Sequence, residues 1–307
     1  MKNMKLQINS LNNQIRLLRT CNFVQHELII RSEMKRLGFK PAKLPKLILP
    51  KNDIEFGHYL AGLIDGDGHF SSRFSICFNI ADSHLAYYLQ RRLGFGYVYK
   101  VKDKNAVNFT VSDRLGIEIV ISLINGKFRT ESKFKQLTRL LEAPKFNRFS
   151  KTIKLSLNKG TSPKDFDNYW LAGFSDADAS FQIKLVKRSA SRTEVRLNYQ
   201  VDQKTDYLLC MIKNLFGGYV GHRGSQNTAY YGSTSYTSAD KVVKYFDHYH
   251  MLSTKFINYL QWRKVYTLIK THQHLTPKGL KRIQKIKSIM NSQNKYYCLL
   301  MDSINDL

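Results

Sequence analysis

Hydrophobic and polar residues alternate along two stretches of the chain. Between residues 73 and 80 every second residue is hydrophobic, and the remaining positions are Arg73, Ser75, Cys77 and Asn79. A period of two is that of a β-strand with one buried face and one face in water. The pattern returns between residues 195 and 201, with polar side chains at Arg196, Asn198 and Gln200. We therefore predict one strand in each stretch.

The chain also repeats itself in longer blocks. The segment from Tyr59 to Phe70 returns from Trp170 to Phe181, an offset of 111 (178 − 67). Later blocks match in the same order: Phe78-Asn79-Ile80 with Tyr199-Gln200-Val201, Gly96-Tyr97-Val98 with Gly218-Tyr219-Val220, and Lys133-Phe134 with Lys255-Phe256. Order and register kept across these blocks indicate a duplicated unit. The offset grows between Phe181 and Tyr199, which predicts a longer, polar hairpin tip at 187–193 in the second copy.

Each copy has the same predicted order of elements. A helix carries the first repeated segment, strands follow it at 70–80 and 181–201, and further helices with a second hairpin complete the copy. Hairpins combined with helices in this order predict an α+β fold. Small residues about four apart mark one face of each repeated helix: Ala61, Gly62 and Gly66 in the first, and Ala172, Gly173 and Ala177 in the second. Such faces let two helix backbones approach closely, so we expect the two helices to pack on each other.

Two acidic residues end the repeated helices. Asp67 and Asp178 fall at the C-terminal ends, where free carbonyls and the helix dipole already concentrate negative potential. A cation between them would relieve the repulsion, and hard oxygen ligands suit Mg²⁺. For Asp65 and Asp176, two residues earlier, we predict a structural role in hydrogen bonds that end each helix. A tight helix pair with capping acids and no chemistry is the alternative.

The charge of the chain indicates a polyanionic partner. Among 307 residues, 49 Lys and Arg face 23 Asp and Glu, a formal net charge of +26. A surface this basic attracts nucleic acid, although ribosomal, histone-like and membrane-surface proteins share the property. Polar strand faces bearing Arg, Asn and Gln favour nucleic acid, because these side chains hydrogen-bond base edges in the major groove. The four cysteines lie far apart, which gives no case for a zinc site.

At these residues the chain resembles a known family. Residues 60–68, LAGLIDGDG, resemble the signature of the LAGLIDADG homing endonucleases, and residues 171–179, LAGFSDADA, are similar but end in Ala. The resemblance implies two pseudo-symmetric αββαββα halves, motif helices packed at the centre, and two β-saddles that straddle DNA. It divides the chain into a basic N-terminal extension (1–52), a first half (53–143), a linker (144–166), a second half (167–291) and a C-terminal tail (292–307).

The same resemblance implies roles for individual residues. Asp67 and Asp178 would bind the metal, with the carbonyls of Gly66 and Ala177 as further ligands. Lys255 would act on the scissile phosphate, with Lys133 as its repeat partner and Lys127 as the rival of Lys133. Gln203 would position water in the second half, where its repeat partner is Asp82 in the first. This difference predicts unequal cutting of the two DNA strands. The residues that we expect to contact DNA are Arg73, Ser75, Asn79, Lys184, Arg196, Asn198, Gln200 and Arg223.

The function expected from these residues is metal-dependent cleavage of a long DNA site. A monomer would cut both strands of a non-palindromic duplex of roughly 20 base pairs, given about 10 base pairs per turn. Cleavage would use Mg²⁺, with ions such as Mn²⁺ able to substitute, and would leave 3′ overhangs as the family does. An RNA maturase that assists intron splicing on the same fold is the main alternative. A DNA-binding regulator without catalysis would be expected to lack Asp67 or Asp178.

The expected location is intracellular. No apolar run approaches the length of a membrane span, and we expect no membrane partner. The first acidic residue is Glu27, and the basic residues before it lie among Leu and Ile, as in an organelle transit segment. A basic helix lying against the main fold is an equally good interpretation. By its resemblance to organelle-encoded intron products, the protein is expected in mitochondria.

Overall fold

A computed structural model describes residues 47–160, 162–189 and 192–304, so most of the predicted basic extension lies outside the described residues. The chain forms two compact units that interleave along the sequence. The described part of the first unit contains Leu47, His69–Ser122 and Gln136–Ile153, and the second contains Ile48–Gly68, Leu123–Lys135 and the chain from Lys154 onward. The first motif helix therefore belongs to the second unit, together with the second motif helix.

The first unit is built on a four-stranded antiparallel sheet in the order β1-β2-β4-β3. Its elements, with the helix ends that continue into the second unit, are β1 (Gly68–Phe70), β2 (Phe74–Asn79), α3 (Ser83–Leu93), β3 (Tyr97–Lys100), β4 (Ala106–Val111), α4 (Arg114–Ile124), α5 (Glu131–Leu141) and α6 (Asn147–Ser150). On β2 the side chains of Phe74, Ile76 and Phe78 are buried. Residues between them are partly or fully exposed, which confirms the predicted alternation.

The second unit repeats this sheet in the order β5-β6-β8-β7. Its elements are α2 (Asp53–Asp67), α7 (Trp170–Asp178), β5 (Ala179–Lys187), β6 (Thr193–Gln203), α8 (Tyr207–Phe216), β7 (Tyr219–Arg223), β8 (Thr228–Ser233), α9 (Tyr236–Phe246), α10 (Lys255–Lys270) and α11 (Pro277–Ile304). Taken with the first sheet, the order confirms the α+β class and the two αββαββα halves. Helices α5 and α10 follow the αββαββα pattern at equivalent positions within the two halves.

The repeat extends to single backbone positions. Gly96 and Gly218 precede equivalent strands with φ of +88° and +87°. A Cβ atom at Gly96 would lie 2.7 Å from the carbonyl oxygen of Thr110, and one at Gly218 would lie 2.6 Å from that of Gly232. Both positions combine a left-handed backbone with a close neighbouring strand, so each requires glycine.

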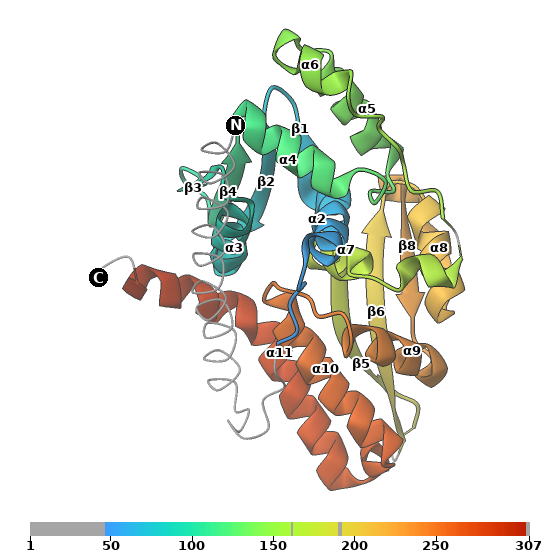
Figure 1. Ribbon diagram of the computed structural model, residues 1–307. Helices are drawn as coiled ribbons and strands as arrows, with labels where there is room; N and C mark the ends of the chain where they lie inside the picture. The colour runs from blue at the N-terminus through green and yellow to red at the C-terminus, as the bar shows by residue number, and fades with distance from the viewer. Residues whose placement is uncertain (1–46, 161, 190–191, 305–307) are drawn as a thin grey trace. The chain divides into compact units, whose positions relative to one another are not determined.

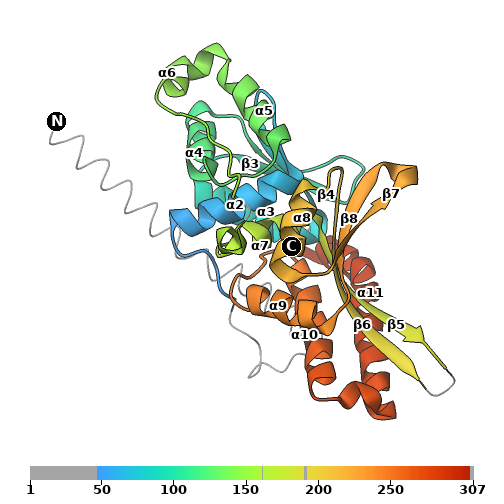
Figure 2. The same ribbon diagram turned by 90° about the vertical axis from the view of Figure 1, so that its right-hand side faces the viewer.

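The first hairpin of the second half is the longer one. Strand β5 ends at Lys187 and β6 begins at Thr193, which confirms the hairpin tip predicted at 187–193. Figure 2 shows this hairpin projecting well beyond the helices α9 and α10. On its inner face the ring of Phe181 lies 5.4–5.6 Å from the rings of Phe246, Tyr259 and Trp262. Helices α9 and α10 therefore cover the inner face of this sheet, and its outer face is left for polar residues.

Two motif helices cross at unusually short range in the second unit. A Cβ atom at Gly62 would lie 1.8 Å from the carbonyl oxygen of Trp170, and one at Gly173 would lie 2.0 Å from that of Tyr59. Gly62 with Gly173, and Tyr59 with Trp170, are repeat partners, so the contact is symmetric. Both ribbon views show α2 and α7 side by side (Figures 1 and 2). The close helix packing predicted from the small residues is confirmed.

The first acid of each motif is buried in this interface. Asp65 accepts hydrogen bonds from the indole of Trp170 at 2.8 Å, the backbone of Arg129 at 2.7 Å and the hydroxyl of Thr130 at 2.6 Å. Asp176 accepts from the hydroxyl of Tyr59 and from the backbone of Leu252, both at 2.7 Å, and also from Ser253.

These donors give the two acids a cross-linking role. They come from the opposite motif helix and from the segments just before α5 and α10. The carboxylates thus tie the start of each later helix to the motif pair. We had predicted that these carboxylates hydrogen-bond the ends of their own helices, and this part of the prediction is wrong.

We predict that Gly62→Ala destabilises the protein by about 2 kcal/mol or more, because the added methyl group meets backbone that cannot move independently. Gly224→Ala is the matched control, since a Cβ atom there meets nothing within 4 Å. Urea unfolding followed by circular dichroism measures both. A loss in Gly62→Ala no larger than that of the control would contradict the close helix contact.

Candidate active site

The second acid of each motif lies at the end of its helix. Asp67 is the last residue of α2 and is exposed, whereas Asp178 is the last residue of α7 and is half-buried. A Cβ atom added at Gly66 would lie 3.0 Å from Oδ2 of Asp178 and 2.3 Å from the Cβ atom of Ala177. The crossing of the motif helices therefore brings both helix ends, with their acids, to one place.

At this position both carboxylates have raised pKa values. Burial, and next the negative charge of Asp67, raise the pKa of Asp178 to about 6. Partial desolvation by the surrounding protein also raises the pKa of Asp67, although the residue still reaches solvent. Lys255 and Lys133 oppose both shifts through their positive charges. Two acids that resist ionisation beside each other create a place where a cation is favoured.

Two lysines occupy the helix ends. The ammonium group of Lys255 donates to the carbonyl oxygen of Ala177 at 2.5 Å, and that of Lys133 donates to the carbonyl oxygen of Gly68 at 2.5 Å. Burial lowers the pKa of Lys133, against the charges of three nearby acids. Lys127 instead donates to the carbonyl oxygen of Leu123 at 2.7 Å. This geometry favours Lys133 over Lys127 as the partner of Lys255.

The alternation of side chains along β6 directs Gln203 toward Asp178. Gln203 ends β6 with the parity of the buried residues Tyr199 and Val201, so its side chain points inward. Its amide nitrogen donates to Oδ2 of Asp178 at 2.7 Å. Asp82 belongs to the first unit, where it immediately precedes α3. The contribution of Asp82 to catalysis stays a prediction.

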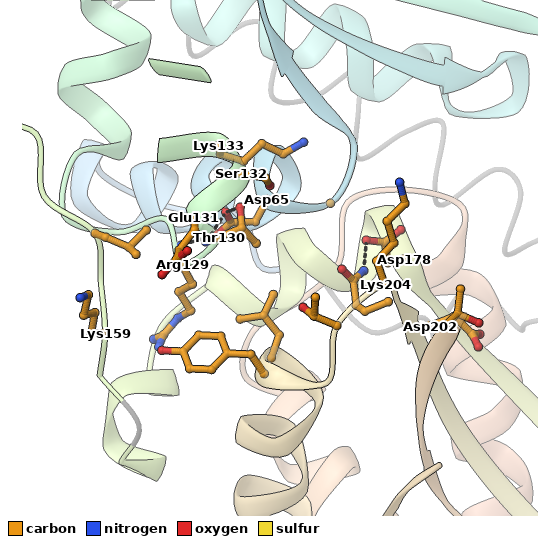
Figure 3. Close-up of a pocket in the computed structure, with 17 residues that line it drawn as sticks. Asp65, Arg129, Thr130, Glu131, Ser132, Lys133, Lys159, Asp178, Asp202 and Lys204 are labelled. Atoms are coloured by element: carbon orange, nitrogen blue, oxygen red, sulfur yellow. Dashed lines mark hydrogen bonds between the residues drawn. The ribbon is translucent and has the colours of Figure 1, made fainter. Parts of the chain in front are cut away.

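A large cavity opens beside Asp178. It has a volume of about 1070 Å³, and its walls include Asp178, Gln203, Lys133, Lys204 and Thr228. Figure 3 shows the side chains of Lys133 and Lys204 extending toward the open space from different elements, with Asp178 near Lys204. The second-half acid therefore faces space large enough for a substrate group.

The outer face of the second sheet carries a connected row of polar side chains. Asn198 donates to the side-chain oxygens of Gln182 and Gln200, each at 3.2 Å. We had expected Asn198 on a wet face, but it is only 1% exposed because its polar neighbours cover it. Sequence reasoning missed Gln182, although the alternation of Ser180, Gln182 and Lys184 along β5 was a signal for it.

Charged residues of this face are already paired with one another. Arg196 pairs with Glu194 at 2.7 Å, and Arg223 pairs with Asp202 while its guanidinium lies 4.6 Å from the ring centre of Tyr230. Lys184 is exposed on the same face. Tyr219 and Tyr230 were not singled out from the sequence, although the repeated Gly-Tyr-Val block marked the first of them.

The outer face of the first sheet also carries two tyrosines. Ser75 is partly exposed on β2 between the buried residues Phe74 and Ile76, and Arg73 is exposed at the start of this stretch. Asn79 is exposed too, but its side-chain oxygen accepts from the backbone of Ala81 at 3.0 Å. Sequence reasoning missed the exposed pair Tyr97 and Tyr99, whose rings stack 5.6 Å apart on β3. This pair adds planar, hydrogen-bonding surface to the expected contact residues.

Metal binding would depend on few protein ligands. The described residues contain no group of three His, Cys, Asp or Glu side chains able to hold a metal ion. Two carboxylates that keep free coordination positions for water and phosphate fit Mg²⁺, which retains several waters in its protein sites. None of the helices within the described ranges is both long enough and apolar enough to cross a membrane.

Sequence comparison matches both halves of the chain to one family. The sequence model of the family described as LAGLIDADG endonuclease matches residues 60–143 and 171–266. The cox1 intron-2 37.2 kDa protein of Schizosaccharomyces pombe is 57% identical over 79% of this chain and 75% of its own length. The intron-encoded DNA endonuclease aI3 of Saccharomyces cerevisiae is 30% identical over 72% of this chain and 65% of its own length.

Two further comparisons extend these matches. The intron-encoded RNA maturase bI4 of Saccharomyces cerevisiae is 25% identical over 60% of this chain, but the match covers only 28% of the maturase. Among solved structures, the I-LtrWI LAGLIDADG homing endonuclease bound to target DNA superimposes with a TM-score of 0.61. That match covers 77% of this chain and 97% of the other at 19% identity, so it concerns the fold.

We predict that Asp178→Asn stabilises the metal-free protein at pH 8. Because the pKa of Asp178 is raised in the folded state, its ionised form destabilises folding above about pH 6. This cost disappears as the pH falls below the unfolded value of about 4. The expected gain is about 1–2 kcal/mol at pH 8 and close to zero at pH 4.

Urea unfolding in EDTA at both pH values measures this gain. Glu142→Gln, at an exposed position, serves as the control. A gain that is equal at pH 4 and pH 8 would show that the charge of Asp178 is not its cause.

Proposed function

The chain belongs to the LAGLIDADG endonuclease family, and we propose that it is a homing endonuclease that cuts both strands of a specific DNA site. One observation carries the proposal. Asp67 and Asp178 meet at the crossed ends of the motif helices, surrounded by Lys133, Lys255 and Gln203. A tight helix pair alone would need neither the two like charges nor the lysines that oppose them.

The protein residues would divide the work at each scissile phosphate. Divalent ions such as Mg²⁺ or Mn²⁺, held by Asp67 and Asp178 with the carbonyls of Gly66 and Ala177, would activate water and stabilise the attacking and leaving oxygens. To free the carbonyl oxygen of Ala177 for the metal, the ammonium group of Lys255 would have to move from it toward the phosphate. Lys255 and Lys133 would stabilise the charge that develops on the phosphate. On the Asp178 side, Gln203 fixes the carboxylate through its amide and leaves its own oxygen to orient a water molecule.

DNA binding would use the outer faces of the two sheets. The formal charge of +26 favours a long duplex contact, roughly 20 base pairs for two ribbons that follow about one turn each. Arg73, Ser75, Asn79, Lys184, Arg196, Asn198, Gln200 and Arg223 are the proposed contacts. Because the two faces differ in residues, the site would be non-palindromic. We further propose a monomer and 3′ overhangs.

The two cleavage centres are proposed to differ in rate. Gln203 contacts Asp178, whereas its repeat partner is the acid Asp82. An amide can donate to a carboxylate, but an ionised carboxylate cannot. We therefore propose that a nicked intermediate accumulates. For location we propose the mitochondrion, on the basis of the relatives' intron-derived names and the basic residues that precede Glu27.

We predict that Asp67→Asn and Asp178→Asn each lower the rate of double-strand cleavage at least about a hundredfold, because one metal-binding charge is lost. Target affinity should stay within about threefold, since base and phosphate contacts come from the sheets. Selection from a randomised DNA library identifies the target. Gel shift in EDTA then gives affinity, and cutting with Mg²⁺ gives the rate.

Glu142→Gln, an exposed acid, is the control and should cut like the parent. If either Asp variant cuts both strands at the parental rate, the metal assignment is wrong. If both variants lose folding and DNA binding together, the acids are structural.

RNA binding is a second candidate function, which the maturase relative and helix α11 favour. Four basic residues are exposed on successive turns of α11: Lys278, Lys281, Arg282 and Lys285. The apolar residues Ile283 and Ile286 are buried, and no Asp or Glu occurs between residues 271 and 301. The exposed face of this helix therefore presents positive charge without a neighbouring acid of its own.

The basic face lies away from the proposed DNA surface. Arg282 is close enough to Lys264 of α10 to help burial lower the pKa of Lys264 to about 8. Lys264 follows Tyr259 by five positions and Trp262 by two, so it points to the opposite side of α10 from the rings that touch the sheet. We propose that α11 could contact RNA while DNA lies on the sheet.

We predict that changing the four basic residues of α11 to Gln weakens binding to a 24-base-pair RNA duplex at least about tenfold at 0.15 M salt, because four phosphate contacts are lost. Binding to an equally long DNA duplex should change less than about threefold. Changing Lys151, Lys154, Lys213 and Lys241, all exposed, to Gln is the charge-matched control. Fluorescence anisotropy measures both ligands. Equal losses for RNA and DNA, or an equal loss in the control, would reject this surface.

A further inference from the structure

The cavity beside Asp178 contains groups that the proposed metal chemistry does not use. Lys204 follows Gln203 directly, is exposed, and lines the cavity with Lys133. In Figure 3 both lysine side chains extend toward the same open space near Asp178. The cavity volume of about 1070 Å³ far exceeds the roughly 200 Å³ of a hydrated metal ion, at about 30 Å³ per water. Room remains for part of a nucleotide.

The hydroxyl group of Thr228 lies in the same wall. Within the described part of the chain, Oγ1 of Thr228 is buried and makes no hydrogen bond. Strands β6 and β8 pair Asp202 with Tyr230 and Gln203 with Ala229, so the next step of the register sets Lys204 opposite Thr228. By the alternation along each strand, the side chains of both residues belong to the outer face of the sheet. A buried hydroxyl without a partner destabilises the folded protein, and a hydrogen bond to a ligand oxygen would remove that cost.

The acids that line this cavity are largely engaged elsewhere. Asp65 is saturated by donors from Trp170, Arg129 and Thr130. Asp202 pairs with Arg223 and also accepts from the amide of Gln200 at 2.8 Å. The remaining exposed charges in the wall are the acid Glu131 and the bases Lys159 and Lys204. With Lys133, three lysines stand against the two acids Glu131 and Asp178, which leaves an excess of positive charge for an anion.

We infer that Lys204 and Thr228 form a phosphate subsite, which holds a DNA backbone phosphate next to the one cut at Asp178. The inference rests on the proposed endonuclease function. Lys204 supplies the charge and Thr228 supplies a hydroxyl donor, the two groups with which proteins commonly fix a phosphate. Their place at the end of β6 and β8 continues the outer sheet face toward Asp178. Lys204 is thus a positioning residue for the strand cut at that acid.

The subsite is present in one half of the protein. The repeat partner of Lys204 is Ser83, which begins α3 and is only 9% exposed. A buried serine supplies no positive charge to a phosphate. The two strands of the target would therefore be held differently near the two acids, independently of the difference between Gln203 and Asp82.

The test is strand-resolved, single-turnover cleavage of a target duplex that carries a different fluorophore on each strand. We expect Lys204→Gln to slow cutting of one strand about tenfold and to leave the other within about twofold. Thr228→Val, which keeps the shape of the side chain, should slow the same strand. Lys204→Arg should restore the rate because it keeps the charge. Lys213→Gln is the control, since Lys213 is exposed on α8 and lies outside the cavity.

A second measurement separates this inference from the endonuclease proposal. In EDTA, binding of Lys204→Gln to the target should show a salt slope smaller by about 0.9, the loss of one phosphate contact. Parental rates for both strands together with an unchanged slope would overturn the subsite. Equal slowing of both strands in variants that fold normally would also overturn it. A parent protein that binds but never cuts would reject the endonuclease, and the slope would still decide the subsite.

Discussion

The close crossing of α2 and α7 is the contact on which the rest of the structure depends. Gly62 and Gly173 let each helix approach the backbone of the other to a distance that no larger side chain permits. Because the contact is symmetric, it joins the two halves at equivalent positions and brings both helix ends together. Asp65 and Asp176 then extend the contact to the segments that lead into α5 and α10. A single interface thereby places two acids and two lysines.

This placement puts two acids that resist ionisation side by side at the proposed cleavage site. The carboxylates of Asp67 and Asp178 stand where helix carbonyls already point, and burial resists their ionisation. Lys133 and Lys255 occupy the nearby carbonyls, so the protein partly balances the charge itself. A divalent ion and a phosphate would complete that balance. The folded protein holds the arrangement because buried hydrogen bonds on either side fix the helices that carry it.

The outer sheet faces differ from the active site in how their polar side chains are paired. On the second sheet the polar side chains bond to one another, as in the row through Gln182, Asn198 and Gln200 and in the pair of Arg223 with Asp202. On the proposed DNA surface, a bound duplex would exchange these contacts for base contacts, and only a well-matched sequence would return as many hydrogen bonds as it displaces. The internal pairing would then make mismatched sites costly, which favours specificity over raw affinity.

Sequence alone determined the duplication, the α+β halves, the packing of the motif helices and the longer hairpin tip, because these follow from local period, small-residue spacing and repeat register. Only the tertiary structure decided which atoms meet. The donors to Asp65 and Asp176 come from residues far along the chain, and Asn198 is buried by neighbours on its own sheet face. The cavity lined by Lys204 and Thr228 likewise forms only where the ends of two different strands meet. Contacts between distant segments leave no local pattern, so a single sequence cannot reveal them.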